Sequence, residues 1–298
     1  MTSARLFMTG GTGFIGQALC EALAERYQIT VLTRYPERPH SALPAAVKRV
    51  SQVPVSFTEF DAVINLAGAP IADRRWTDAR KQLLLDSRFT LTEALVKAMA
   101  NGAPRVFISG SAIGYYGAQK AELTLTEDTP FDSDDFAHRL CQGWEQRALA
   151  ATPMTRVCLL RTGLVLGHGG ALKKMLPAFR LGLGGQIGSG KQIMSWISLA
   201  DMVSAIIFLL DNDQLSGAFN CTAPHPVSNR AFTDTLGQLL HRPTWLTVPA
   251  WAITLLLGEG ATLLLDGQSV LPQRLTEAGF SFLDPTLEQA LGRILAAN

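Results

Sequence analysis

The sequence predicts an α/β fold: a doubly wound parallel sheet joined to a smaller, mainly helical C-terminal domain. Three observations lead to this prediction. Apolar runs of strand length alternate with segments of helical period through the first half of the chain. A glycine-rich stretch joins the first strand-like run to the first helical segment. After residue 165 the pattern changes, and glycine-rich and helical segments replace the alternation.

The expected strands are residues 5–9, 29–33, 62–67, 106–109 and 157–161. Between them lie expected helices at 14–25, 77–100 and 134–150, with Thr77 as an N-cap and residues 102–104 as the stop signal of the second. Strands that alternate with helices form right-handed crossovers, and such crossovers build a parallel sheet covered on both faces.

The second half predicts a different organisation. Residues 168–191 contain seven glycines and one proline and read as a loop-rich lid. Residues 197–210 form an apolar segment with Asp201 near its start, 218–222 a short strand, and the tail a helical, turn-rich cap. We therefore expect one domain from residues 1–165 and 198–224, and a cap domain from 166–197 and 225–298.

Composition excludes several classes of protein. Among 298 residues, 47% are hydrophobic and 17% charged, which excludes a disordered, collagen-like or coiled-coil chain. The net charge of +1 gives no basic surplus for nucleic acid. The most apolar stretch, 249–265, is interrupted by Gly258, Glu259 and Gly260, so no membrane partner is expected.

The four cysteines and five histidines show no metal-ligand spacing, so no metal is expected. The cysteines lie far apart without a CxxC pair, and no signal-peptide pattern opens the chain. We expect reduced core thiols and a cytoplasmic location.

The glycine-rich stretch Thr9-Gly10-Gly11-Thr12-Gly13-Phe14-Ile15-Gly16 lies where the first strand passes into the first helix. In a Rossmann dinucleotide site the first glycine allows the tight turn, the second lets the backbone approach the pyrophosphate, and the third lets helix and strand pack closely. The helix N-terminus offers free N–H groups to the phosphates. The motif predicts a dinucleotide cofactor.

The end of the second strand predicts which cofactor is used. A carboxylate at this place would hold a ribose 2′-hydroxyl, but the sequence has Thr33-Arg34, and its nearest acid, Glu37, follows Pro36. A guanidinium can bind a 2′-phosphate through two hydrogen bonds. We therefore expect NADP(H), with Arg34 on the phosphate; a solvated loop arginine is the alternative.

The glycines and strand ends resemble those of the extended short-chain dehydrogenase/reductase family, the NAD(P)-dependent sugar-nucleotide epimerases and dehydratases, over residues 5–222. The resemblance continues in Asn65-Leu66-Ala67-Gly68, in Ser109-Gly110-Ser111-Ala112 with Tyr115-Tyr116-Gly117, in Leu160-Arg161-Thr162-Gly163 and in Trp196-Ile197-Ser198. The tail, with Leu257-Gly258-Glu259 and Leu271-Pro272-Gln273-Arg274-Leu275, resembles the C-terminal domain of unknown function of an atypical epimerase-like branch.

The resemblance breaks at the catalytic pair. The family uses Tyr-x-x-x-Lys on a helix, so that the lysine lowers the pKa of a proton-shuttling tyrosine. Matching Glu145 to the family's acidic position puts Ala137 and Cys141 at the tyrosine and lysine sites. Neither can do that chemistry. Cys141 lies on the apolar helix stripe as a core residue, whereas His138 and Arg139 fall off it and are expected in solvent.

The candidate catalytic residues are therefore Ser111, Tyr115 and Tyr116, for which turn capping and aromatic packing are the structural alternatives. Arg88 interrupts an apolar stripe with Leu84, Leu91 and Leu95, and needs a buried carboxylate, a cofactor phosphate or an anionic substrate as its partner. The candidate cofactor-binding residues are Thr9, Gly10, Gly13, Phe14, Ile15, Thr33, Arg34, Leu66, Ala67, Gly68, Arg88, Ser109, Thr162 and Gly163.

Two functions follow. The first is an NADP(H)-dependent, epimerase-like oxidoreductase acting on an unknown small molecule, with sugar-nucleotide-like compounds among the candidates. The second is a non-catalytic NADP(H)-binding regulatory or interaction protein, for example in cell division. The family resemblance also allows a homodimer through the long helices.

Overall fold

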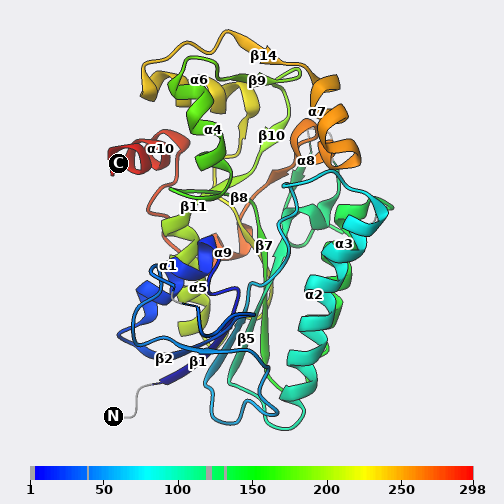
Figure 1. Cartoon of the computed structure of the whole chain (residues 1–298), viewed down its shortest axis with the longest axis vertical. Coiled ribbons are helices and arrows are strands. Elements are labelled where there is room, and N and C mark those ends of the chain that lie inside the picture. Colours follow the sequence, from blue (N-terminus) through cyan, green and yellow to red (C-terminus); the bar gives the residue numbers. More distant parts are fainter. Residues whose placement is uncertain (1–3, 39, 119–122, 131–132, 298) are drawn as a thin grey trace.

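A seven-stranded, fully parallel sheet forms the centre of the computed structural model, which describes residues 4–38, 40–118, 123–130 and 133–297 (Figure 1). The strands run in the order β12-β7-β5-β4-β1-β2-β3. Their bounds are β1 Ala4–Thr9, β2 Tyr27–Leu32, β3 Lys48–Val50, β4 Ala62–Asn65, β5 Val106–Ala112, β7 Arg156–Thr162 and β12 Gly217–Cys221. The strand order reverses beside β1, and such a switch point is where α/β sheets bind ligands.

Helices cover both faces of this sheet (Figure 1). Helices α1 (Phe14–Leu23) and α5 (Leu199–Asp211) pack on one face, against Leu6 and Met8 of β1. Helices α2 (Asp78–Met99) and α3 (Phe136–Leu149) cover the other face, where Phe7 packs. Because neighbouring residues of β1 face opposite layers that are both buried, the strand is apolar throughout.

The cap lies beyond the carboxyl ends of the strands (Figure 1). Its own core joins α4 (Gly170–Arg180), α6 (Asn229–Leu240) and the C-terminal α10 (Leu287–Ala296) around the fully buried Trp196. The other helical elements of the tail are α7 Ala250–Leu257, η2 Gly258–Ala261, α8 Thr262–Leu265 and α9 Gln273–Glu277.

Four two-stranded sheets tie these segments together. Their members are β8 (Leu164–Leu166) with β11 (Trp196–Ser198), β9 (Gly185–Ile187) with β14 (Leu246–Val248), β10 (Ile193–Met194) with β13 (Val227–Ser228), and β6 (Thr124–Leu125) with β15 (Ser269–Val270). The tail adds no strand to the central sheet, as expected.

The predicted elements are all present, with bounds that shift by a few residues. Thr77 caps α2 by accepting a hydrogen bond from the amide of Arg80. The prediction missed β3, whose three residues Lys48–Val50 show only part of a strand pattern. The expected lid, residues 168–191, is not simply loop-rich, because it contains α4; Gly182, Gly188 and Gly190 supply the turns that follow.

All four cysteines are buried free thiols, as the sequence predicted. Across the described part of the chain, no helix combines the length and the apolar character needed to cross a membrane. The same residues contain no group of three or more side chains arranged to hold a metal ion.

Candidate functional site

The turn between β1 and α1 is built so closely that glycine is required at two of its positions. Gly10 has φ of +72°, and a Cβ there would lie 2.7 Å from the carbonyl carbon of Leu66. A Cβ on Gly16 would lie 2.2 Å from the carbonyl oxygen of Gly10. Since both obstacles are backbone, neither can move aside cheaply. Gly16, the last glycine of the motif, therefore has the packing role that the motif predicts.

The N-terminus of α1 is open to a ligand. Gly13 is its N-cap residue and is exposed, and no described side chain caps the helix. The amides of the first helical turn have no partners within a helix, and the helix dipole adds partial positive charge there. A Cβ on Gly13 would lie 3.1 Å from the Gly10 carbonyl oxygen, which is a tight contact. A bare helix start of this kind fits a pyrophosphate.

A buried polar network lies below this turn and joins three strands. The hydroxyl of Thr9 donates to Oδ1 of Asn65 over 2.7 Å, and Nδ2 of Asn65 donates to Thr92 over 2.9 Å and to Ser109 over 3.3 Å. Thr9 also accepts from the amide of Ala67. The side chains of Thr9 and Ser109 thus hold the sheet edge together, and their predicted cofactor contacts stay predictions.

The loop after β4 rests on Arg88. The Arg88 guanidinium donates to the carbonyl oxygens of Leu84 and Ala69, each over 3.1 Å, and its Cζ would lie 2.8 Å from a Cβ on Gly68. It also lies 5.1 Å from the ring centre of Trp144. Among the described residues its partners are carbonyl and hydroxyl oxygens, not a carboxylate. Burial lowers the pKa of Arg88.

Arg88 therefore shapes the loop that carries Leu66, Ala67 and Gly68. Leu66 and Ala67 lie against the Gly10 turn, since a Cβ on Gly10 would meet the backbone of both residues. Of the three partners considered from the sequence, the structural carboxylate is absent from the described contacts.

Exposed arginines follow β2. Thr33 continues the sheet through its amide, which donates to the carbonyl of Val50, and Arg34 lies exposed beyond it. The guanidinium carbons of Arg34 and Arg38 lie 6.0 Å and 4.1 Å from the ring centre of Tyr35. Arg34 is therefore available for a phosphate at the predicted position.

Phe14 connects the turn to the cap. A Cβ on Gly167, Gly169 or Gly170 would come within 2.5–3.3 Å of the Phe14 ring. The ring thus packs on a glycine surface that leads into α4. Ile15 is half-buried against the core of the α1 face. Thr162 ends β7 and Gly163 follows it, and a Cβ on Gly163 would lie 2.5 Å from the carbonyl oxygen of Ser195.

A buried ion pair lies at the end of β5 and β7. The Ser111 hydroxyl donates to Oε1 of Glu145 over 2.6 Å, and Arg161 donates to both carboxylate oxygens over 2.9 Å and 3.0 Å. Burial alone would lower the pKa of Arg161, but the hydrogen bonds and charge of Glu145 raise it. Ser111 lies inside β5 rather than in a loop after it.

The two tyrosines differ sharply. Tyr116 is fully buried, and its hydroxyl bonds Asn220 over 2.8 Å and Arg161 over 3.0 Å. Burial raises its pKa. Tyr115 is half-buried, and its ring centre lies 3.5 Å from the Arg161 guanidinium carbon. This geometry favours packing for Tyr116, whereas the hydroxyl of Tyr115 has no hydrogen bond among the described contacts.

The helix face that carries the family's Tyr-x-x-x-Lys pair bears two small side chains here and contacts a neighbouring turn. Ala137 and Cys141 lie one turn apart on α3, and a Cβ on Gly114 would lie 3.4 Å from each of their side chains. Gly114 belongs to the 3₁₀ turn η1 (Ile113–Tyr116), which packs on this face. Burial raises the pKa of Cys141 to about 12, so it stays a neutral thiol. Its predicted core position is confirmed.

One expectation on α3 is wrong. His138 is 1% exposed, not in solvent, because its ring lies against Tyr115 and its Nδ1 bonds the Tyr115 carbonyl oxygen. The 3₁₀ turn covers more of the helix than the apolar stripe alone indicates. Arg139 is exposed, as expected.

Sequence reasoning also missed the roles of Glu145 and Arg161. Arg161 interrupts an apolar strand, and Glu145 lies on the apolar face of its helix four residues after Cys141; a charge on an apolar face is the signal that led to Arg88. Two such residues of opposite charge predict a buried pair.

The comparisons with known proteins agree with this architecture. Residues 6–222 match the model of the NAD dependent epimerase/dehydratase family, and residues 248–294 match a domain of unknown function, DUF1731. An epimerase family protein of Mycobacterium bovis, Mb2239, is 41% identical over 98% of both chains. The chloroplastic SDR39U1 homolog of Arabidopsis thaliana is 39% identical over 97% of this chain and 86% of its own.

A solved structure is similar over the whole chain. Human epimerase family protein SDR39U1 (isoform 2), crystallised with NADPH, has a TM-score of 0.89 and 33% identity, covering 99% of this chain and 100% of its own. The family match covers more than half of the sequence, and the DUF1731 match covers most of the C-terminal tail. This chain belongs to the NAD-dependent epimerase/dehydratase family and carries a DUF1731 domain at its C-terminal end.

Proposed function

We propose that the protein binds NADP(H) at the carboxyl edge of its sheet. The observation that carries this proposal is the β1–α1 turn, where Gly10 and Gly16 leave no space for a side chain and Gly13 leaves the helix start uncapped. The human relative solved with NADPH supports it. Gly10, Gly13, Phe14 and Ile15 would hold the phosphates, and Arg34 the 2′-phosphate.

The remaining cofactor contacts are part of the same proposal. The loop of Leu66, Ala67 and Gly68 would lie along the cofactor. The residues that would support this edge of the sheet from beneath are Thr9, Arg88 and Ser109. Further contacts would come from neighbouring strand ends, at Thr33, Thr162 and Gly163. The four buried free thiols support a reducing, cytoplasmic setting.

The activity that we propose is redox chemistry on a small carbonyl or alcohol substrate. NADP(H), when bound, supplies or accepts a hydride. Tyr115 would orient the substrate oxygen and exchange a proton with it through its hydroxyl. Ser111 would accept a hydrogen bond from the substrate, since its own proton is donated to Glu145. Tyr116, fully buried in its network, would set the shape of this site.

A second candidate is an NADP(H)-binding regulatory or interaction protein without catalysis. The presence of Ala137 and Cys141 on α3 favours it, because neither residue can act in the family's proton relay. A homodimer is compatible with either function and stays a prediction.

Cofactor binding is tested by calorimetric titration with NADPH and NADH. Gly13→Ala is the matched variant, since its backbone φ of −85° accepts alanine while the new methyl group would obstruct a phosphate. We expect a loss of at least tenfold in NADPH affinity with a small decrease in melting temperature, since the added Cβ would lie 3.1 Å from the Gly10 carbonyl oxygen. Gly292→Ala is the control, because no atom lies within 4 Å of its added Cβ. No heat with either cofactor for the folded wild type would refute the proposal.

Turnover separates the two candidates. The NADPH-loaded protein is incubated with a panel of carbonyl compounds and sugar nucleotides while nicotinamide absorbance is followed. Turnover that falls more than tenfold in Tyr115→Phe and Ser111→Ala supports the enzyme. Tight binding of NADPH without turnover of any compound favours the second candidate.

A further inference from the structure

The tip of the cap exposes large apolar side chains from two neighbouring turns. We call this the tip surface: Leu181 and Leu183 after α4, and Trp245 and Leu246 at the start of β14. Their exposed fractions are 74%, 60%, 91% and 50%. In water such a cluster leaves apolar area unburied, and a contiguous patch of this kind marks an interaction site.

The two turns are held together, so the surface is built by the fold. Arg242 donates from Nε to the carbonyl oxygen of Arg180 over 2.8 Å. A Cβ on Gly182 would lie 3.5 Å from Pro243. Beyond the turns, Gly185 of β9 pairs with Leu246 of β14. The apolar side chains therefore project from a braced pair of turns.

His241 sets the direction of the second turn. It has φ of +53°, the sole positive φ of a non-glycine residue in the described part of the chain, and its left-handed backbone ends α6. A residue other than glycine or asparagine adopts this conformation at a cost. The bend turns the chain back along α6, where Thr244 bonds Asp234 and a Cβ on Gly237 would lie 2.3 Å from the Thr244 side chain.

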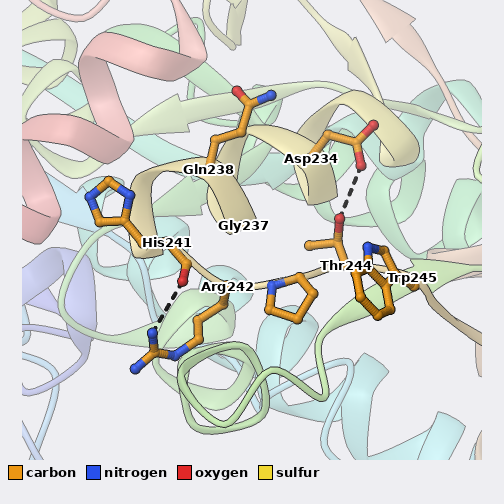
Figure 2. Close-up of a pocket in the computed structure, with 8 residues that line it drawn as sticks. Asp234, Gly237, Gln238, His241, Arg242, Thr244 and Trp245 are labelled. Carbon is orange, nitrogen blue, oxygen red and sulfur yellow. Dashed lines mark hydrogen bonds between the residues drawn. The ribbon is translucent and has the colours of Figure 1, made fainter.

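A hollow opens on this tip (Figure 2). Its volume is about 580 Å³, and its lining combines charged, polar and aromatic side chains: Asp234, Gly237, Gln238, His241, Arg242, Pro243, Thr244 and Trp245. Asp234 accepts a hydrogen bond from Thr244 across it. The glycine turn and the Glu145–Arg161 pair do not line it.

The charges around the tip surface are mainly positive and uncompensated. Arg180 and Arg242 are the nearest guanidinium groups, and neither is paired with a carboxylate among the described ion pairs. Asp234, the acidic residue at the hollow, already lies 3.8 Å from Arg230 and bonds Thr244. A surface that carries a layer of negative charge would therefore be electrostatically complementary to Arg180 and Arg242.

We propose that the tip surface docks this protein on a membrane surface that carries anionic lipids. The two turns would place Leu181, Leu183 and Leu246 among the acyl chains and Trp245 at the headgroup level, where tryptophan is enriched. Arg180 and Arg242 would contact lipid phosphates. The earlier expectation of no membrane partner rested on the lack of a spanning segment, and surface docking requires none.

Charge favours the membrane over a second copy of the chain. A two-fold contact through this surface would bring Arg180 and Arg242 of both copies close together in a desolvated interface. Like charges without partners oppose such a contact. An anionic bilayer instead gains from each arginine, by roughly fivefold in partitioning, since about 1 kcal/mol accompanies each cation near the surface.

The test is vesicle flotation with the full-length protein, using phosphatidylcholine vesicles with and without phosphatidylglycerol. We expect binding to the anionic vesicles, weakened at high salt. The double variant Leu183→Ser/Trp245→Ser is expected to lose at least tenfold in partitioning. Val55→Ser is the matched control, because Val55 is 85% exposed but lies on the loop after β3. NADPH affinity and melting temperature are expected to stay unchanged in both variants.

Two results would overturn the proposal. Wild-type protein that does not float with anionic vesicles at low salt excludes docking. Self-association in light scattering that the double variant abolishes, without vesicle binding, assigns the tip surface to a second copy. Both readouts are independent of NADPH binding, so the proposed function stands or fails separately.

Discussion

The Arg161 guanidinium binds the Glu145 carboxylate in a two-pronged hydrogen bond, and both side chains are nearly excluded from water. Ser111 donates to the same carboxylate, and Tyr115 stacks on the same guanidinium. The two hydroxyl-bearing residues that we assign to the substrate are thus both positioned by one ion pair. It joins β5, β7 and α3, so the geometry of the site depends on the packing of the domain.

Removal of one partner of this pair is expected to destabilise the fold. Glu145→Ala leaves the Arg161 charge buried without a carboxylate, and breaking a buried pair costs about 3–5 kcal/mol. Urea unfolding measures the change. Glu93→Ala is the control, since its pair with Arg147 is in contact with solvent, with side chains 58% and 32% exposed, and contributes about 0–1 kcal/mol. Equal effects of the two substitutions would contradict the structural role of Glu145.

Restoring the family's catalytic pair is expected to fail. Ala137→Tyr with Cys141→Lys would place two large side chains against η1, where a Cβ on Gly114 would already contact both native side chains at 3.4 Å. Overpacking costs about 1–3 kcal/mol, and a buried unpaired lysine adds to it. The melting temperature should fall without a gain in turnover. A stable double variant with new activity would show that η1 moves aside easily.

The sequence predicted the sheet, its helices and the glycine turn because each depends on local patterns. Strand alternation and helical period are short-range properties, and the Gly10–Gly16 motif contains its own geometric reason. The loss of the Tyr-x-x-x-Lys pair could also be seen, because the spacing is fixed within one helix. The contact of Phe14 with Gly167–Gly170 could not, since it joins segments about 150 residues apart.

The catalytic candidates were harder to separate for the same reason. Tyr115 and Tyr116 are adjacent in sequence, and their different burial is decided by Asn220 and Arg161, which come from β12 and β7. His138 was placed in solvent because a helix stripe cannot show that η1 folds over it. Long-range packing, not propensity, decides these positions.

Cofactor preference is expected to depend on Arg34. Arg34→Asp replaces a cation that would bind the 2′-phosphate with a carboxylate that repels it and can bind a ribose hydroxyl. We expect NADPH affinity to fall by about 10–100-fold, as for the loss of a charge-assisted bond, while NADH affinity holds or rises. Fluorescence titration with both cofactors measures the ratio. Lys48→Asp makes the same charge change at the first residue of β3, whereas Arg34 lies beyond Thr33, which bonds the last residue of β3, Val50. The ratio of NADPH to NADH affinity in this control should stay that of the wild type.

The thiols are expected to be inert at neutral pH and to link stability to alkaline pH. Burial raises the pKa of Cys20 and Cys158 to about 11 and that of Cys141 to about 12, from an ordinary value of 9.0. The folded chain therefore keeps these protons to a higher pH than the unfolded chain does. Their contribution to stability is complete below pH 9 and is lost as the pH rises through about 11 to 12.

Two measurements check this linkage. At pH 8 none of the four thiols should react quickly with Ellman's reagent in the folded protein, and all four should react in guanidinium chloride. Urea midpoints should hold from pH 7 to 9 and decline above it. A Cys141→Ala variant reports on the share of Cys141, because it removes the buried thiol of α3 that lies beside η1. A thiol that reacts at pH 8 in the wild type and is absent from this variant would make Cys141 a nucleophile instead of a core residue.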